Sequence, residues 1–235
     1  MMGKAKILAI VPARSGSQQL PDKNIRSFNG KPLMAWSIEA ALRSAVVDTV
    51  IVSTDSAAYA DIARQYGAEV PFLRPAVLSG SDAGLISALK FTVEQLALAG
   101  RYFDWVICLQ PTSPLRTSEH IKVAVQQFHD INDEKKSMAS VYRVADKFRW
   151  LLRTTDIGTL QFIDADIAKS SAFARQHNGS VYMPNGAIFI MQTAEMTGQY
   201  TECTYPFLMD ELSSADIDTI DDFYFAESLF KKINA

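Results

Sequence analysis

Short apolar runs alternate with longer stretches of helical periodicity along the first half of the chain, and this alternation restricts the possible folds more than any other feature. The apolar runs predict buried strands at residues 5–11, 49–53 and 105–109. The stretches between them predict amphipathic helices at residues 32–44, 57–66 and 83–98. Strands that are apolar throughout and are separated by helices form parallel sheets with both faces covered. The sequence therefore predicts an α/β fold with three layers.

The regular pattern is interrupted in residues 147–183. Short strand-like pieces at residues 148–153 and 160–163 are joined there by polar stretches. A segment of this kind buries little of itself, and irregular segments of this length are usually functional. We predict an arm that packs on a second subunit; the alternative is a long surface excursion on the same subunit.

Further elements are expected on both sides of this arm. A helix is predicted at residues 118–128 and a strand at residues 137–144. After the arm, residues 186–191 predict a strand, and residues 222–233 predict an amphipathic helix. A chain of 235 residues is long enough for one large domain, so residues 1–235 are predicted to form a single domain.

The charge balance excludes some classes of partner. With 23 basic and 26 acidic residues and a net charge of −3, the chain lacks the basic excess typical of nucleic-acid-binding proteins. An anionic substrate must therefore be bound by a local cluster of cations. No apolar run approaches the roughly 20 residues of a membrane helix, and the run after Lys6 is too short for a signal peptide. Two distant cysteines argue against a disulfide framework. We expect a cytoplasmic protein that binds neither nucleic acid nor membrane.

The first part of the loop after the first predicted strand, residues 12–24, carries two cations, Arg14 and Lys23, among small polar residues. Such a loop offers backbone N–H groups to phosphate in α/β folds, and two cations suit a triphosphate. It is not a Walker A loop, because Gly30-Lys31 is followed by Pro32, and it lacks the G-x-G-x-x-G of a dinucleotide fingerprint. A solvated loop with two chance cations is the alternative.

Other polar residues follow the second and third predicted strands. Asp55 ends the second strand, and Gln110 and Thr112 follow the third in a loop that two prolines restrain. Because ligands bind off the carboxyl ends of strands in open α/β sheets, these residues are expected at the same rim as Arg14 and Lys23. For Asp55 the alternative is that Asp55 or Ser56 simply caps the next helix. For residues 110–112 the alternative is a rigid lead into the helix that follows.

A pair of carboxylates near the C-terminus is the best candidate for a metal site. In an extended segment Asp216 and Asp218 point the same way, while Ile217 turns into the core. Two carboxylates on one face can bind a hard cation such as Mg²⁺, whose remaining ligands come from phosphate and water. The alternative is an Asp-rich turn before the last helix. The three histidines show no metal-binding spacing.

Five blocks of the sequence, taken in order, resemble one enzyme family. They are residues 13–24 (ARSGSQQLPDKN), 52–55 (VSTD), 109–116 (LQPTSPLR), 184–188 (PNGAI) and 216–218 (DID), the last followed by Asp222-Phe223 and Ala226-Glu227. The chain resembles the acylneuraminate cytidylyltransferases, also called CMP-sialic acid synthetases. The blocks span nearly the whole chain, and their combination is far more specific than any one of them.

The resemblance implies a nucleotide-diphospho-sugar transferase-like fold, which is Rossmann-like with a mostly parallel sheet, and a nucleotidyltransferase reaction. The anomeric hydroxyl of a nine-carbon 2-keto sugar acid attacks the α-phosphate of CTP in that reaction, which needs Mg²⁺ and gives the CMP-sugar and pyrophosphate. The resemblance also implies a homodimer, in which residues 147–183 form the dimerisation arm over the neighbour's active site.

By matching position, the resemblance implies roles for individual residues. The nucleotide is expected to contact Ala13, Arg14, Ser17, Lys23, Asn24, Arg74 and Ser81. The sugar acid is expected to contact Gln110, Arg175 and Phe189. Asp216 and Asp218 are expected to bind Mg²⁺ and, with Arg14 and Lys23, to form the catalytic set.

Three departures from the family pattern bear on the substrate and the rate. Gln18-Gln19 stands where the family usually has Lys-Gly, Met183 stands where an Arg is often found, and residues 78–82 hold one extra residue. Legionaminic and pseudaminic acids are alternative substrates, and the eight-carbon Kdo is disfavoured because residues 110–112 lack the Asp of that branch. A catalytically weakened nucleotide-binding relative is the alternative from a different class, since position 18 has lost a cation.

Overall fold

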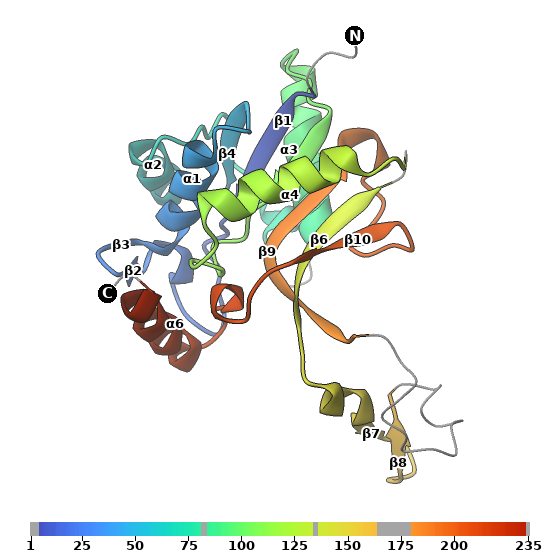
Figure 1. Cartoon of the computed structure of the whole chain (residues 1–235). Coiled ribbons are helices and arrows are strands. Elements are labelled where there is room, and N and C mark those ends of the chain that lie inside the picture. The colour runs from blue at the N-terminus through green and yellow to red at the C-terminus, as the bar shows by residue number, and fades with distance from the viewer. Residues whose placement is uncertain (1–4, 81–83, 134–135, 164–179, 234–235) are drawn as a thin grey trace.

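The computed structural model describes residues 5–80, 84–133, 136–163 and 180–233. Its centre is a six-stranded sheet in the order β10-β6-β9-β5-β1-β4 (Figure 1). The strands are β1 Ile7–Pro12, β4 Thr49–Ser53, β5 Trp105–Cys108, β6 Ser137–Arg143, β9 Tyr182–Gln192 and β10 Thr204–Leu208. β9 runs antiparallel to β5 and β6, whereas the pairs β1–β4, β1–β5 and β6–β10 are parallel. The sheet is therefore mostly parallel, as the apolar runs predict.

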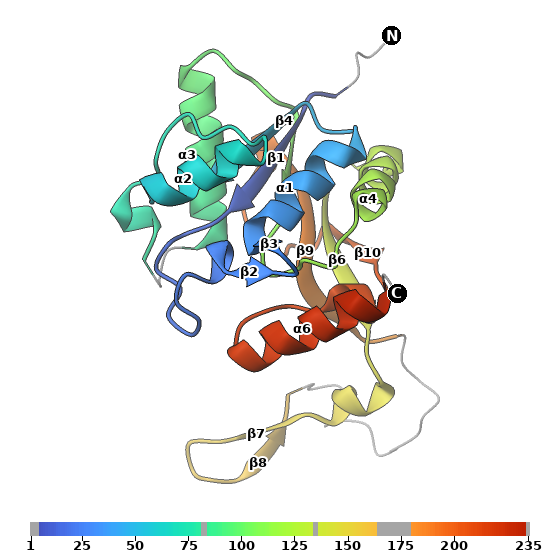
Figure 2. The same cartoon turned by 90° about the vertical axis from the view of Figure 1, so that its left-hand side faces the viewer.

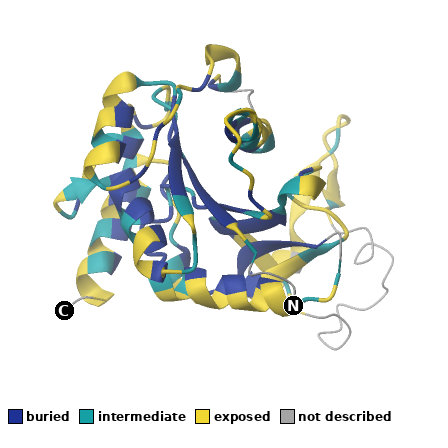
Figure 3. Ribbon diagram, turned by 90° about the horizontal axis from the view of Figure 1, so that it is seen from above, coloured by how far each residue is buried: buried dark blue, intermediate teal, exposed yellow. Residues whose placement is uncertain are grey.

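Helices cover both faces of this sheet. Their bounds are α1 Leu33–Ser44, α2 Ala57–Gln65, α3 Leu85–Leu98, α4 Ser118–Asp130 and α6 Ile220–Ile233. The helices α1, α2 and α4 share a hydrophobic core with one face, and α3 shares another with the opposite face. Figure 2 shows the strands between these helices and Figure 3 shows that the strands are buried, so the three-layer prediction is confirmed. None of the helices in the described part of the chain is long and apolar enough to cross a membrane.

Alternate residues of β1 explain why both faces must be covered. Ile7, Ala9 and Val11 belong to the core shared with α1, α2 and α4, whereas Leu8 and Ile10 belong to the core shared with α3. Successive side chains of a strand point to opposite faces of a sheet. All five residues are at most 3% exposed. A strand that is apolar throughout can be buried in this way only when helices cover both faces of the sheet.

The last helix, α6, packs against a hairpin that follows the first loop. This hairpin pairs β2 Ser27–Phe28 with β3 Lys31–Pro32. The Phe28 ring meets the Phe223 ring edge-on, with centroids 5.5 Å apart. Ile217 is fully buried in the same cluster. The segment that precedes α6 is thereby held beside the loop that follows β1.

The edge strand β10 is not indicated by the sequence pattern. Of its five residues only Phe207 is buried, and Pro206 lies in the middle. Proline is tolerated at a sheet edge because one side of the strand needs no hydrogen-bond donor. Such a strand has no apolar run, and its position depends on pairing with β6, which is distant in the sequence.

The first part of the expected arm projects away from the sheet (Figure 1). It contains the 3₁₀ helix Asp146–Trp150 and an antiparallel hairpin of β7 Leu152–Thr154 and β8 Leu160–Phe162. All three residues of β7 are exposed, and Trp150 and Leu151 are 44% and 47% exposed. The described part of the arm therefore carries several large apolar side chains that are exposed, among them Leu151, Leu152 and Leu160.

Candidate active site

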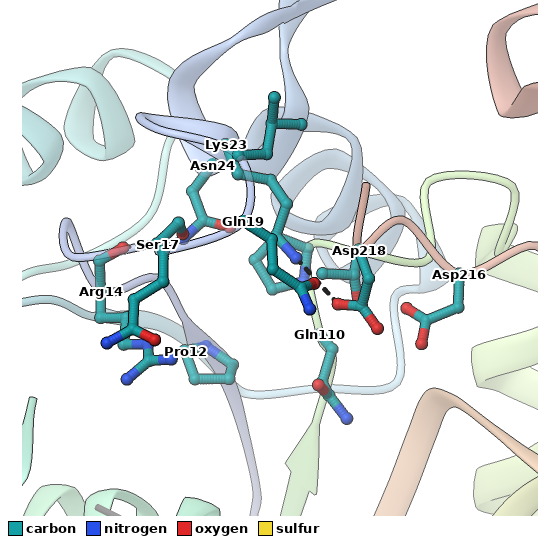
Figure 4. A pocket seen from close by; sticks show the side chains of 13 residues that line it. Pro12, Arg14, Ser17, Gln19, Lys23, Asn24, Gln110, Asp216 and Asp218 are labelled. Carbon is teal, nitrogen blue, oxygen red and sulfur yellow. Dashed lines mark hydrogen bonds and ion pairs between the residues drawn. The ribbon is translucent and has the colours of Figure 1, made fainter. Parts of the chain in front are cut away.

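A cavity of about 570 Å³ opens at the carboxyl ends of β1 and β5 (Figure 4). Three segments line it: residues of the first loop between positions 12 and 24, the loop of residues 110–112 after β5, and Asp216 with Asp218. Ligands of α/β sheets bind at this edge. The fold therefore gathers candidate residues from the beginning, middle and end of the chain around one space.

Lys23 connects the two ends of the chain at this cavity. Its Nζ atom donates a hydrogen bond to the Ile217 carbonyl oxygen at 2.7 Å and lies 3.1 Å from Asp218 Oδ1. The Lys23 side chain is only 12% exposed, so its charge is partly shielded from solvent and its ion pair is less screened by salt. The structure thus brings the cation of the first loop to the late carboxylates, as the sequence predicts.

Asp216 and Asp218 lie side by side because Ile217 between them is anchored in the core (Figure 4). The Ile217 N–H donates to the Thr112 carbonyl oxygen at 2.9 Å, which fixes this segment to the loop after β5. Asp216 is open to the cavity, yet the protein atoms packed around it raise the pKa of its carboxyl. The Asp218 charge raises that pKa further, and a hydrogen bond with the Thr112 side chain opposes both effects. A cation between the carboxylates would relieve this repulsion.

The donor set at this edge suits Mg²⁺ together with a phosphorylated substrate. Two carboxylates supply oxygen ligands of the right kind, but the described ranges contain no cluster of three or more His, Cys, Asp or Glu side chains. Mg²⁺ commonly takes one or two protein carboxylates and completes its ligands with phosphate and water. Arg14 and Lys23, which could hold those phosphates, line the same cavity.

Four of the residues expected at the nucleotide line the cavity: Arg14, Ser17, Lys23 and Asn24. Asn24 is buried, and its Nδ2 atom donates to the Arg14 carbonyl oxygen at 2.9 Å. The Arg14 guanidinium donates from Nη1 to the Gly80 carbonyl oxygen at 2.6 Å. Asn24 therefore fixes the backbone of the loop, and Arg14 spans from that loop to the segment before α3.

The other expected nucleotide residues lie behind the cavity wall or outside the described residues. Ala13 is fully buried, and its N–H donates to the Ser53 carbonyl oxygen at 2.9 Å. Arg74 is 6% exposed and donates from Nε to Ser79 Oγ at 3.1 Å. Burial lowers the pKa of Arg74, and the charge of Asp55 opposes that shift. Ser81 lies outside the described residues.

Asp55 lies beside the first loop, as expected, and of the two candidate caps for the next helix, Asp55 and Ser56, the structure confirms Ser56. The cap of α2 is Ser56, whose Oγ accepts from the Tyr59 N–H. The Asp55 carboxylate instead accepts from the Ser15 N–H at 2.9 Å and from Ser15 Oγ at 3.0 Å. Asp55 therefore ties the first loop to the end of β4 without lining the cavity. The sequence signal for this contact is the position of Asp55 just after a predicted strand.

Gln110 enters the cavity from the loop after β5 and is supported from behind by buried polar groups. Its carbonyl oxygen accepts from Ser37 Oγ and from Arg116 Nη1, both at 3.2 Å. Arg116 is 3% exposed and also donates to the Ala187 carbonyl oxygen at 2.7 Å. Gly186 has φ +68°, and a Cβ there would lie 3.0 Å from Gln110 Nε2. Glycine thus provides both the backbone conformation and the space that the Gln110 side chain needs.

Of the other two residues expected at the sugar acid, only Phe189 is among the described residues, and it does not line this cavity. Phe189 is 4% exposed, because β9 turns its side chain into the core beneath α3, where its ring lies 6.2 Å from that of Tyr200. Arg175 lies outside the described residues. Sequence reasoning also missed the supporting roles of Arg116 and Gly186. The Asn-Gly pair at the start of a predicted strand is the sequence signal that could have indicated the role of Gly186.

Comparison with known proteins shows the family of the chain. Residues 8–221 match the family model described as Cytidylyltransferase. The chain belongs to the cytidylyltransferase family. This cytidylyltransferase is therefore a nucleotidyltransferase, and the enzyme class predicted from its sequence blocks is confirmed.

Two curated relatives cover nearly all of the cytidylyltransferase. It is 38% identical over 234 residues to a CMP-N,N'-diacetyllegionaminic acid synthase of Legionella pneumophila, covering 96% of this chain and 97% of the relative. It is 38% identical over 238 residues to an N-acylneuraminate cytidylyltransferase of Escherichia coli O18:K1:H7, covering 98% of this chain but 54% of the relative. A solved CMP:2-keto-3-deoxy-manno-octonic acid synthetase complexed with CTP superimposes with a TM-score of 0.74 at 14% identity, over 97% of this chain and 100% of the other. That likeness supports the fold alone.

Proposed function

We propose that this cytidylyltransferase transfers CMP from CTP to the anomeric hydroxyl of a nonulosonic acid, a nine-carbon 2-keto sugar acid of the sialic type. The observation that carries the proposal is the single cavity lined by Arg14, Lys23, Gln110, Asp216 and Asp218. The names of both relatives at 38% identity specify nonulosonic acids, which supports this substrate class.

The proposed reaction depends on positioning and charge neutralisation more than on covalent chemistry from the protein. Arg14 and Lys23 hold the triphosphate by charge-assisted hydrogen bonds, and Gln110 orients the sugar acid. The sugar hydroxyl loses its proton as its oxygen bonds to the α-phosphorus, and the bond from that phosphorus to the pyrophosphate oxygen breaks. Asp216 and Asp218 would hold Mg²⁺, which when bound supplies positive charge to the phosphate oxygens.

Arg74 is proposed to support the nucleotide from behind Arg14. The charge of Arg14 lowers the pKa of Arg74, so the two guanidinium groups lie close enough to repel each other. An anion held near both is stabilised by both. The nucleotide roles of Ala13 and Ser81 and the sugar roles of Arg175 and Phe189 stay predictions from the family pattern.

Pyrophosphate release tests the proposed function directly. The assay contains CTP, Mg²⁺ and one acid from a panel of N-acetylneuraminic, legionaminic and pseudaminic acids and the eight-carbon Kdo. We expect release with at least one nine-carbon acid, no release with Kdo, and no release after Mg²⁺ is chelated. Binding of CTP without release for any acid would contradict the proposal and favour a catalytically weakened relative.

Gln18→Lys is expected to raise kcat/KM for CTP about tenfold, because a charged hydrogen bond to phosphate is worth about 1.5–3 kcal/mol. Gln18 and Gln19 line the cavity as neutral amides beside Arg14 and Lys23. Gln65→Lys is the matched control, since Gln65 is exposed at the end of α2. Steady-state kinetics check this prediction, and equal rates for both variants and the wild type would remove the missing cation as a cause of weak activity.

We propose that residues 147–183 form a dimerisation arm. The exposed apolar side chains of its described part, among them Leu151, Leu152, Leu160 and Ile163, support this role. We expect a native mass of twice 26.0 kDa by light scattering, and a monomer when Leu152 and Leu160 are both replaced by Asp. The control is Val77→Asp, because Val77 is 82% exposed on the body of the molecule. A monomeric wild-type protein would favour the surface excursion instead.

A cytoplasmic location is also proposed. Cys108 and Cys203 are both free thiols, which fits a reducing compartment. Cys108 is fully buried, and burial raises the pKa of its thiol to about 12, so it is chemically inert at neutral pH. Neither cysteine lines the cavity, so neither is assigned a part in the reaction.

A further inference from the structure

The side chain of Asn185 lies at a bulge in β9 and is 2% exposed. Its amide has partners on both sides. Nδ2 donates to Ser214 Oγ at 2.8 Å, and Oδ1 accepts from Ser140 Oγ and from the Ala187 N–H at 3.1 Å. A buried amide with this many partners has a fixed orientation, because releasing any partner leaves a buried polar group unsatisfied.

One side of Asn185 supports the carboxylates. Ser214 is 5% exposed, ends a short 3₁₀ helix, and also donates to the Asp210 carbonyl oxygen at 2.6 Å. Two residues later comes Asp216, and then Ile217, which is anchored to the Thr112 carbonyl oxygen. The turn that delivers Asp216 to the cavity is therefore held by the Asn185 amide.

The other side of Asn185 supports the loop that carries Gln110. The main-chain carbonyl oxygen of Asn185 accepts a hydrogen bond from Ser113 Oγ at 3.2 Å, and Ser113 is fully buried. Ser113 lies three residues after Gln110, and its N–H approaches the Gln110 carbonyl oxygen at 3.4 Å. Gly186, next to Asn185, leaves room for the Gln110 side chain. One residue of β9 therefore contacts both segments that complete the cavity wall.

We propose that Asn185 is a positioning residue that sets the carboxylates of Asp216 and Asp218 in register with Gln110. It acts through Ser214 toward the carboxylates and through Ser113 toward the sugar acid. This inference rests on the proposed function. Substitutions behind metal ligands commonly lower metal affinity or activity about 10- to 100-fold, which sets the scale of the expected effect.

The decisive variant is Ser214→Ala. Asn185→Ala would leave several buried polar groups without a partner, so a loss of activity in that variant could reflect misfolding. Ser214→Ala is expected to weaken Mn²⁺ binding to the CTP-bound protein about tenfold, read by electron paramagnetic resonance. It should lower kcat to a similar extent, with partial recovery in excess Mg²⁺, and leave KM for the sugar acid within about twofold. Ser113→Ala should show the opposite split, with KM for the sugar acid raised about threefold and Mn²⁺ affinity unchanged.

Ser44→Ala is the control for loss of a buried serine. Its hydroxyl donates to the Ala41 carbonyl oxygen at 2.6 Å, within α1 and away from the cavity. We expect a comparable loss of Tm with wild-type kcat and Mn²⁺ affinity. An active wild type whose Ser214→Ala and Ser113→Ala variants both keep wild-type Mn²⁺ affinity and KM would overturn the role of Asn185. A wild type that makes no CMP-sugar would instead contradict the proposed function.

Discussion

Asp216→Asn is expected to lower kcat about a thousandfold while CTP still binds. The substitution keeps the size of the side chain but removes one of the two charges proposed to hold Mg²⁺. Metal ions contribute several kcal/mol of charge stabilisation in such transition states, and about 1.4 kcal/mol corresponds to a factor of ten in rate. Turnover with saturating substrates, and CTP affinity by calorimetry, measure the two halves of this prediction.

The same variant should retain or slightly raise Tm. Crowding by protein atoms and the Asp218 charge raise the pKa of Asp216. A carboxyl whose pKa is higher in the folded than in the unfolded state disfavours folding once it is ionised, so neutralising it removes no stabilising charge. Asp221→Asn makes the same chemical change at an exposed position of α6, outside the cavity, and should keep wild-type activity. Equal kcat for both variants would exclude Asp216 from the metal role.

Lys23→Met is expected to lower kcat/KM for CTP about 100- to 1000-fold. Lys23 supplies a partly shielded charge where the triphosphate is proposed to lie, and removing one preorganised group of this kind costs about 3–4 kcal/mol. The variant also leaves Asp218 without its cation 3.1 Å away. Lys23→Arg should recover only part of the activity, because a planar guanidinium cannot reproduce the contacts of a compact ammonium.

The matched control for Lys23 is Lys31→Met. Lys31 pairs with Glu39 at 2.8 Å and does not line the cavity. We expect wild-type steady-state kinetics for this control with CTP and the preferred acid. A Lys23→Met enzyme with the kinetics of the control would show that the first loop does not bind the triphosphate.

Local sequence signals predict most of the fold. The strand at residues 49–53 and the helix at residues 57–66 are found as β4 and α2, because each buries an apolar pattern of its own period. β10 could not be predicted in this way, because only Phe207 of its five residues is buried. The strand forms by pairing with β6, which is far away in the sequence. Order in the sheet, including the antiparallel β9, depends on such distant pairing as well.

In the candidate site, too, some features could be predicted from local sequence and others depend on contacts between distant residues. Arg14, Lys23 and Gln110 stand in motifs whose residue types indicate phosphate and sugar chemistry, and the structure places all three on one cavity. Supports such as Asp55 and Asn185 act through hydrogen bonds to Ser15 and Ser214. These hydrogen bonds join residues that are far apart in the sequence, so they cannot be predicted from the residue spacing within a single motif.

A structure of the protein crystallised with CTP and Mg²⁺ tests the central claim most directly. The account predicts the triphosphate in the cavity at the ends of β1 and β5, with Arg14 and Lys23 on its oxygens and the metal between it and Asp216 and Asp218. A triphosphate bound elsewhere, or a metal coordinated away from both carboxylates, would contradict it.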